Sequence, residues 1–134
     1  MGPVDDQVVR EDSLIATPDG LEIAVYSHWY RALPLPSLAK VDLSVDGSPV
    51  DPAVLSVTVN GHRYPFDALA EQGDEYWFTT DPAVLHVPVE SAPGRAHRVQ
   101  LLLGLSIPYI LTGPDRVPLV APSRTDKTLT AAGA

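Results

Sequence analysis

The stretch Val99-Gln100-Leu101-Leu102-Leu103-Gly104-Leu105-Ser106-Ile107 carries the strongest structural signal in this sequence. Every odd-numbered position in it is an aliphatic residue, whereas glutamine, glycine and serine occupy three of the four even-numbered positions. Successive side chains of a β-strand point to opposite faces of the sheet. The period of two therefore predicts a long strand with one buried face.

Shorter segments repeat this alternation, and turn residues separate them. The alternating segments are residues 21–25, 41–46, 55–60 and 85–89. Asp46-Gly47 and Asn60-Gly61 favour tight hairpin turns because both positions accept a positive φ. Pro18-Asp19-Gly20 and Ala92-Pro93-Gly94 mark two further turns. Short strands with regular turns predict an all-β, antiparallel β-sandwich or jelly-roll-like fold.

The expected boundaries follow from the ends of this pattern. We expect one domain over residues 12–130, a flexible N-terminal segment over residues 1–11, and a frayed tail over residues 131–134. One short helical turn is expected around residues 66–70. No internal repeat interrupts the domain.

Composition and charge exclude several classes of function. The 134 residues are 45% hydrophobic and 19% charged, which is typical of a globular domain with a core. A net charge of −8 argues against binding to nucleic acid or to an anionic membrane surface. The chain has no cysteine, so disulfides and thiolate zinc sites are excluded. With no signal peptide and no apolar run of about 20 residues, we expect a cytoplasmic protein.

Two proline-rich segments do not fit a plain strand. Residues 29–37 read Trp-Tyr-Arg-Ala-Leu-Pro-Leu-Pro-Ser, and residues 113–122 contain three prolines among apolar residues. Proline lacks the backbone donor that a central strand needs. We expect the first segment to be an extended loop. The apolar residues of the second segment either fold back on the domain's own core or meet a partner.

No catalytic or metal-binding pattern stands out. The four histidines, at positions 28, 62, 86 and 97, lie on four different segments. The sequence has no Gly-x-Ser-x-Gly elbow and no Gly-rich phosphate loop. Two functional interpretations of the residues remain open. One is a carbohydrate-binding module with exposed Trp29, Tyr76 and Trp77, and the other is a cupin-like metalloenzyme whose histidines converge in the fold.

The order of several motifs resembles a known family. The motifs are Tyr30-Arg31-Ala32-Leu33-Pro34-Leu35, Val45-Asp46-Gly47, Val59-Asn60-Gly61 and Lys127-Thr128-Leu129-Thr130. Together they resemble the small β-subunit family of the C-glycoside deglycosidases, over roughly residues 12–130. The chain departs from the family pattern at Ala32, where glycine is usual, and in residues 94–97. Residues 112–124 also look longer than usual.

The resemblance implies a hetero-oligomeric lyase in which this chain is the accessory subunit. The implied partner is an α subunit with a TIM barrel similar to sugar isomerases, carrying a divalent metal (Mn²⁺) and the catalytic bases. The implied substrate is a 3-oxo-C-glycoside, whose ketone acidifies the C2 proton so that the bond to the aglycone breaks by β-elimination. No cofactor or metal is expected on this chain.

The leading expected partner contact is the loop with aromatic, arginine and proline residues, because such residues dominate interface energetics. Its members are Trp29, Tyr30, Arg31, Leu33, Pro34, Leu35 and Pro36. A second contact or a wall of the substrate cleft is expected at His28, Arg116, Val117 and Leu119. No residue of this chain is expected to be catalytic.

Overall fold

The computed structural model describes residues 8–10, 12–27, 29 and 31–133. Its strands are β1 (Leu14–Thr17), β2 (Gly20–Val25), β3 (Leu33–Pro34), β4 (Leu38–Val45), β5 (Ser48–Val50), β6 (Ser56–Val59), β7 (His62–Pro65), β8 (Tyr76–Trp77), β9 (Ala83–Val87), β10 (Ala96–Thr112), β11 (Val117–Thr130) and β12 (Ala132–Gly133). The described residues also form the short 3-10 helices η2 (Leu35–Ser37), η3 (Pro52–Val54) and η4 (Phe66–Glu71). The predicted all-β class is confirmed, and η4 covers the expected helical turn.

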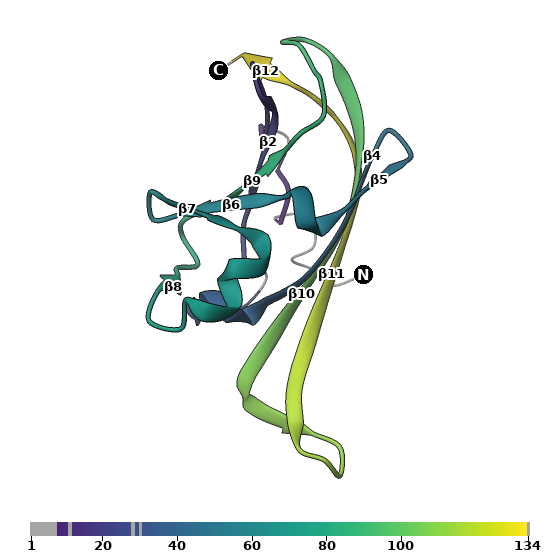
Figure 1. The fold of residues 1–134 in the computed structure, drawn as a ribbon. Helices are drawn as coiled ribbons and strands as arrows, with labels where there is room; N and C mark the ends of the chain where they lie inside the picture. Colours follow the sequence, from purple (N-terminus) through teal and green to yellow (C-terminus); the bar gives the residue numbers. More distant parts are fainter. Residues whose placement is uncertain (1–7, 11, 28, 30, 134) are drawn as a thin grey trace.

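Two larger sheets and a two-stranded ribbon make up the fold (Figure 1). The six-stranded sheet has the order β12-β1-β2-β9-β6-β7, and the four-stranded sheet has the order β11-β10-β4-β5. Strands β3 and β8 pair separately. All neighbours are antiparallel except β1 and β12. One core cluster draws buried side chains from both larger sheets, as expected for a β-sandwich.

The alternating sequence explains which face of each strand is buried. In β10, Leu103, Leu105 and Ile107 are at most 1% exposed, and Val99 and Leu101 are also buried. The predicted hairpin turns have the backbone geometry that their sequences favour. Asp46 has φ 54° and Gly47 φ 83°, and Asn60 and Gly61 repeat the pattern at 55° and 80°.

Described residues on both sides of the expected 12–130 domain pack against it. Val8 and Val9 are buried in the core, so the ordered domain begins before residue 12. At the other end, β12 pairs in parallel with β1, and Ala131 is buried. Residues 131–133 of the expected tail thus lie against the six-stranded sheet. Apolar burial and strand pairing hold both segments against the six-stranded sheet.

The hairpin of β10 and β11 projects beyond one end of the sandwich (Figure 1). We call residues 109–120 of this hairpin the arm. The proline-rich segment after Gly113 was not expected to form a plain strand, yet Pro118 and Pro122 lie within β11. Strand β11 is the edge of its sheet, so a residue without a backbone donor can be accommodated there.

Candidate functional site

The loop predicted as the leading contact is partly used inside the domain. Leu33 pairs with Trp77 in the small ribbon, and Leu35 lies in η2. Both leucine side chains are 2% exposed and belong to the core. Pro34 and Pro36 are half-buried beside them. The two leucines therefore stabilise this domain and do not present free apolar surface.

The start of the same loop lies near the root of the arm. Trp29 donates a hydrogen bond from Nε1 to the hydroxyl of Tyr109, with 2.6 Å between the two atoms. The guanidinium carbon of Arg31 lies 5.2 Å from the centroid of the Tyr109 ring, within range of a cation–π contact. The start of the predicted loop thus meets strand β10 at Tyr109. His28 and Tyr30 lie outside the described residues.

The arm carries most of the large apolar side chains that are exposed among the described residues. These are Tyr109, Leu111, Val117 and Val120, with between 45% and 53% of their surface exposed. Its 12 residues include only two charged ones, Asp115 and Arg116, although the chain as a whole has 17 acidic and nine basic residues. Exposed apolar area with few charges is the composition of an interface core.

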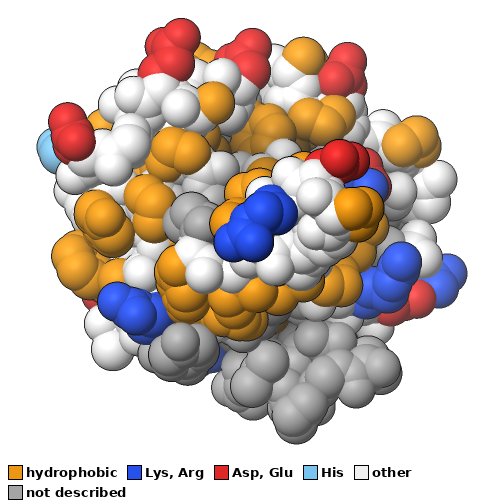
Figure 2. Space-filling view, turned by 90° about the horizontal axis from the view of Figure 1, so that it is seen from below, with side chains coloured by type: hydrophobic (Ala, Val, Ile, Leu, Met, Phe, Trp, Pro, Cys, Tyr) orange, Lys and Arg blue, Asp and Glu red, His pale blue; other side chains and the backbone are white. Residues whose placement is uncertain are grey.

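Two further exposed aromatic residues come from the β8 segment. Tyr76 is 46% exposed and Phe78 is 49% exposed, whereas Trp77 between them is buried and donates to the Asp81 carbonyl at 2.8 Å. Because Tyr76 pairs with Pro34, this segment lies beside the proline-rich loop predicted as the leading contact. Figure 2 views the molecule from the end where the arm projects and shows hydrophobic side chains gathered there, with most acidic side chains toward the rim.

Three of the four residues predicted as the second contact lie on the arm, and the fourth, His28, lies outside the described residues. Arg116 is at the tip, where its φ of 53° and a hydrogen bond from its backbone nitrogen to the Gly113 carbonyl close the turn. Val117 is 53% exposed, and Leu119 is half-buried against the core. The sequence alone did not mark Tyr109, Leu111 or Phe78 as contact residues, whereas Val120 belongs to the 113–122 segment that it did mark. The alternation in β10 could have indicated an apolar row continuing past Ile107, but not that the hairpin leaves the body there.

The described histidines lie in three separate environments. His62 Nδ1 is 2.9 Å from Glu75 Oε2, and His97 Nδ1 is 2.6 Å from Asp46 Oδ2. His86 lies on the outer face of the six-stranded sheet. Within the described part of the chain, no three histidine, aspartate or glutamate side chains are placed to hold one metal ion. The described donor set therefore does not fit the divalent metal that the resemblance implies for the complex.

A hydrogen-bonded cluster surrounds Glu75. Tyr64 donates its hydroxyl to this carboxylate, His62 contacts it, and Asn60 donates to it at 3.2 Å. The hydrogen bond from Tyr64, followed by the one from His62, lowers the pKa of Glu75, and the same carboxylate raises the pKa of Tyr64. Asn60 also donates to the backbone carbonyl of Tyr76. The cluster thus anchors the segment that carries the exposed Tyr76.

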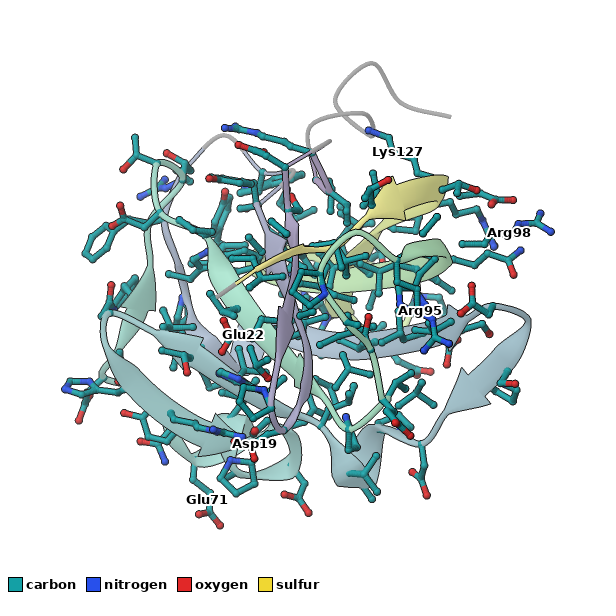
Figure 3. The ribbon with its side chains drawn as sticks, turned by 90° about the horizontal axis from the view of Figure 1, so that it is seen from above. Asp19, Glu22, Glu71, Arg95, Arg98 and Lys127 are labelled. Atoms are coloured by element: carbon teal, nitrogen blue, oxygen red, sulfur yellow. The ribbon has the colours of Figure 1, made fainter. Side chains whose placement is uncertain are left out.

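His86 belongs to a small polar cavity of about 130 Å³. Its Nε2 is 2.7 Å from Thr58 Oγ1, and its Nδ1 is 3.4 Å from Glu22 Oε2. Burial, and then the nearby positive charge of Arg63, lower the pKa of His86. Asp19 and Glu22, which also line this cavity, are labelled in Figure 3. Acidic and basic groups are mixed here, so the cavity favours no single charged ligand.

His97 links three segments through a chain of hydrogen bonds. Its Nε2 is 2.7 Å from Ser91 Oγ, and its Nδ1 contacts Asp46. A serine bonded to a histidine that is bonded in turn to an aspartate is the arrangement that activates a nucleophile in many enzymes. However, His97 is only 3% exposed, and neither the His86 cavity nor a second, open hollow of about 490 Å³ on the four-stranded sheet is lined by Ser91 or His97. We assign these hydrogen bonds a structural role, because they join the turn at residues 46–47 to the loop before β10.

Within the described residues, no helix is long and apolar enough to cross a membrane.

Comparison with known proteins gives consistent matches. The family model described as C-glycoside deglycosidase beta subunit matches residues 4–109. The chain is 32% identical over 131 residues to the C-glycoside deglycosidase beta subunit of Microbacterium trichothecenolyticum, covering 98% of this chain and 99% of that one. It is 33% identical over 105 residues to the 3'-dehydrocarminate deglycosidase beta subunit of a Microbacterium species, covering 78% and 80%. A C-glycoside deglycosidase beta subunit of Arthrobacter globiformis is 34% identical over 108 residues, covering 80% and 82%.

Proposed function

The chain belongs to the family of C-glycoside deglycosidase beta subunits, and from that membership we propose that it is the non-catalytic subunit of a hetero-oligomeric lyase. The proposed reaction cleaves the carbon–carbon bond between sugar and aglycone in 3-oxo-C-glycosides. One relative is named for a 3'-dehydro compound, which supports an oxidised glycoside as the substrate class. The proposed partner is a sugar-isomerase-like TIM-barrel α subunit.

In this proposal the partner supplies the divalent metal and the catalytic bases. The described histidines of this chain are dispersed, and each has at least one ring nitrogen in contact with a neighbouring side chain, which is Glu75 for His62, Thr58 for His86, and Ser91 and Asp46 for His97. A general base has to reach the substrate proton directly or through one water. Side chains committed to separate structural contacts do not form such a site, which favours a role in assembly for this chain.

The observation that carries the proposal is the apolar end formed by the arm and the β8 segment. Six of the seven large apolar side chains that are prominently exposed in the described residues lie there, and Val54 is the seventh. Isolated soluble domains seldom gather so many apolar groups at one end unless a partner covers them. A subunit that braces its partner and closes one side of the substrate cleft accounts for this distribution.

A carbohydrate-binding module is the weaker alternative. It would use exposed flat aromatic rings, but Trp77 is 3% exposed and faces the core. Trp29 is half-buried and engaged by Tyr109. Tyr76 and Phe78 remain as exposed rings at this end, and they serve a protein contact equally well.

The experiment is to purify this chain, an α subunit of the deglycosidase type from the same organism, and their co-expressed complex. Aglycone release from a 3-oxo-C-glycoside is followed by chromatography, and metal content by mass spectrometry. We expect activity to require the complex and the metal to accompany the α subunit. Stoichiometric metal or aglycone release with this chain alone would contradict the proposal, as would failure of the two chains to associate.

A further inference from the structure

The root of the arm contains an irregularity in strand pairing. Ile107 pairs with Leu119, but the next pair is Leu111 with Pro118, so three residues of β10 bulge out between them. Proline is tolerated at such a bulge because the residue does not have to donate to the ladder, and position 108 is a proline. Bulges bend a strand, so the direction of the arm is set at this point.

Few contacts with the sandwich fix the arm beyond the bulge. Residues 111–118 are all exposed, and only Ile110 and Leu119 of the arm pack in part against the core. A two-stranded ribbon is marginally stable by itself. Its orientation therefore depends strongly on contacts at the root.

Tyr109 lies inside the bulge, and two residues that are far from it in the sequence, Trp29 and Arg31, contact it there. The Trp29 indole nitrogen donates to its hydroxyl at 2.6 Å, and the Arg31 guanidinium lies near its ring. Eighty positions separate Trp29 from Tyr109. Trp29 and Arg31 thus contact the residue from which the arm departs.

We propose that the arm is the principal docking element toward the α subunit, and that Trp29 and Arg31 are positioning residues that hold the arm in its binding orientation. This inference rests on the proposed function. The occupant is an apolar, weakly charged groove of the α subunit that accepts a two-stranded ribbon. Holding the ribbon in place before binding lowers the entropy lost on association.

The exposure of side chains in the arm and in the proline-rich loop supports docking by the arm and positioning by the loop. Leu33 and Leu35 of the proline-rich loop are buried in the core. By contrast, Leu111, Val117 and Val120 of the arm are about half exposed. A relative that is named as a beta subunit aligns over 98% of this chain, and its alignment therefore includes most or all of the arm. The family model itself ends at residue 109, so the placement of the contact on the arm rests on the exposed apolar side chains there.

The docking role is tested with two valines of equal exposure at different sites. Val117 on the arm is 53% exposed, and Val54 in η3 is 54% exposed. We expect Val117→Ser to weaken association with the α subunit about tenfold, the loss expected from one buried valine side chain. Val54→Ser should leave the affinity unchanged. Calorimetric titration gives both affinities, and thermal melting shows whether each variant is folded.

The positioning role has a readout that does not involve the partner. Trp29→Phe and Tyr109→Phe each remove the hydrogen bond while keeping an aromatic ring. We expect either substitution to speed amide hydrogen exchange in residues 109–118 of the free chain, with little change in β2 or β9. If the two residues act through one contact, the double variant should exchange no faster than either single variant.

The outcomes separate this inference from the proposed function. If wild-type chain binds the α subunit and Val117→Ser binds equally tightly, the arm is not the docking element, while the subunit role stands. If wild-type chain does not bind, the proposed function fails. Self-association of the free chain that Val117→Ser abolishes would assign the arm to a second copy and overturn the inference. Unchanged exchange in Trp29→Phe would overturn the positioning role.

Discussion

His97 and Asp46 lie 51 positions apart in the sequence, yet His97 Nδ1 is 2.6 Å from Asp46 Oδ2. The other carboxylate oxygen of Asp46 accepts a hydrogen bond from the backbone nitrogen of Arg98 at 2.9 Å. Asp46 forms the tight turn between β4 and β5, and His97 lies near the start of β10. This pair therefore joins a turn to the longest strand of the neighbouring hairpin.

This contact predicts a specific loss of stability in acid. The hydrogen bond to His97, followed by that to Arg98, lowers the pKa of Asp46 below its ordinary value of 3.8. A carboxyl group with a lowered folded-state pKa stabilises the fold above its unfolded-state pKa, and that contribution disappears as pH falls through the folded-state pKa. We expect Asp46→Asn to cost about 1 kcal/mol near neutral pH, because the carboxylate is half exposed.

Asparagine tolerates the positive φ of this position, so the turn should persist in the variant. Urea unfolding of both proteins between about pH 7 and pH 3 gives the measurement. The difference between the two free energies of unfolding should shrink below about pH 4. A difference that stays constant across this range would show that the carboxylate charge contributes nothing.

Gly20 should be far less tolerant of substitution than Gly47, although both have a positive φ. A Cβ at Gly20, where φ is 142°, would lie 2.2 Å from the Val87 carbonyl oxygen, whereas nothing lies within 4 Å of a Cβ at Gly47. We expect Gly20→Ala to cost more than about 3 kcal/mol or prevent folding, and Gly47→Ala to cost about 1 kcal/mol. Thermal melting monitored by circular dichroism compares them, and equal melting temperatures would refute the backbone clash.

Leu103 and Leu102 are adjacent in β10 but face opposite sides of the sheet. Leu103 is 1% exposed in the core, whereas Leu102 is half-buried and lines the hollow on the outer face. We expect Leu103→Ala to lower the free energy of unfolding by about 2–5 kcal/mol because it leaves a cavity in the core. Leu102→Ala should cost about 1 kcal/mol or less, since its side chain loses less burial. Chemical denaturation measures both, and a reversed order would mean that the register is wrong.

Tyr64→Phe should change the titration of Glu75. The Tyr64 hydroxyl is the largest cause of the lowered pKa of this carboxyl group. Removing the hydroxyl should move the pKa of Glu75 upward toward its ordinary value of 4.5. Carbon-detected NMR titration of the side-chain carboxyl group follows the shift, and Glu71, outside the cluster, serves as an internal control. An unchanged titration of Glu75 would show that the hydrogen bond does not form in solution.

Local sequence predicted much of the fold because the relevant physics is local. The alternation of residues 99–107 identified the buried face of β10, since a period of two matches the pleat of a strand. Asp46-Gly47 and Asn60-Gly61 identified hairpin turns, because the required positive φ is a property of these residues themselves. A few motifs and their order along the sequence also indicated the family that the comparisons show.

The tertiary structure decided which apolar residues remain exposed. Leu35 and Leu111 are both leucines in proline-rich surroundings, yet one is 2% exposed and the other 45% exposed. The sequence marked the segment that contains Leu35 and the segment that begins just after Leu111 as candidates, but hydropathy cannot distinguish a side chain packed into its own core from one at a free surface. Similarly, only the fold brings Trp29 to Tyr109. Exposure and long-range proximity depend on how distant strands pack together, whereas strand and turn signals depend on neighbouring residues.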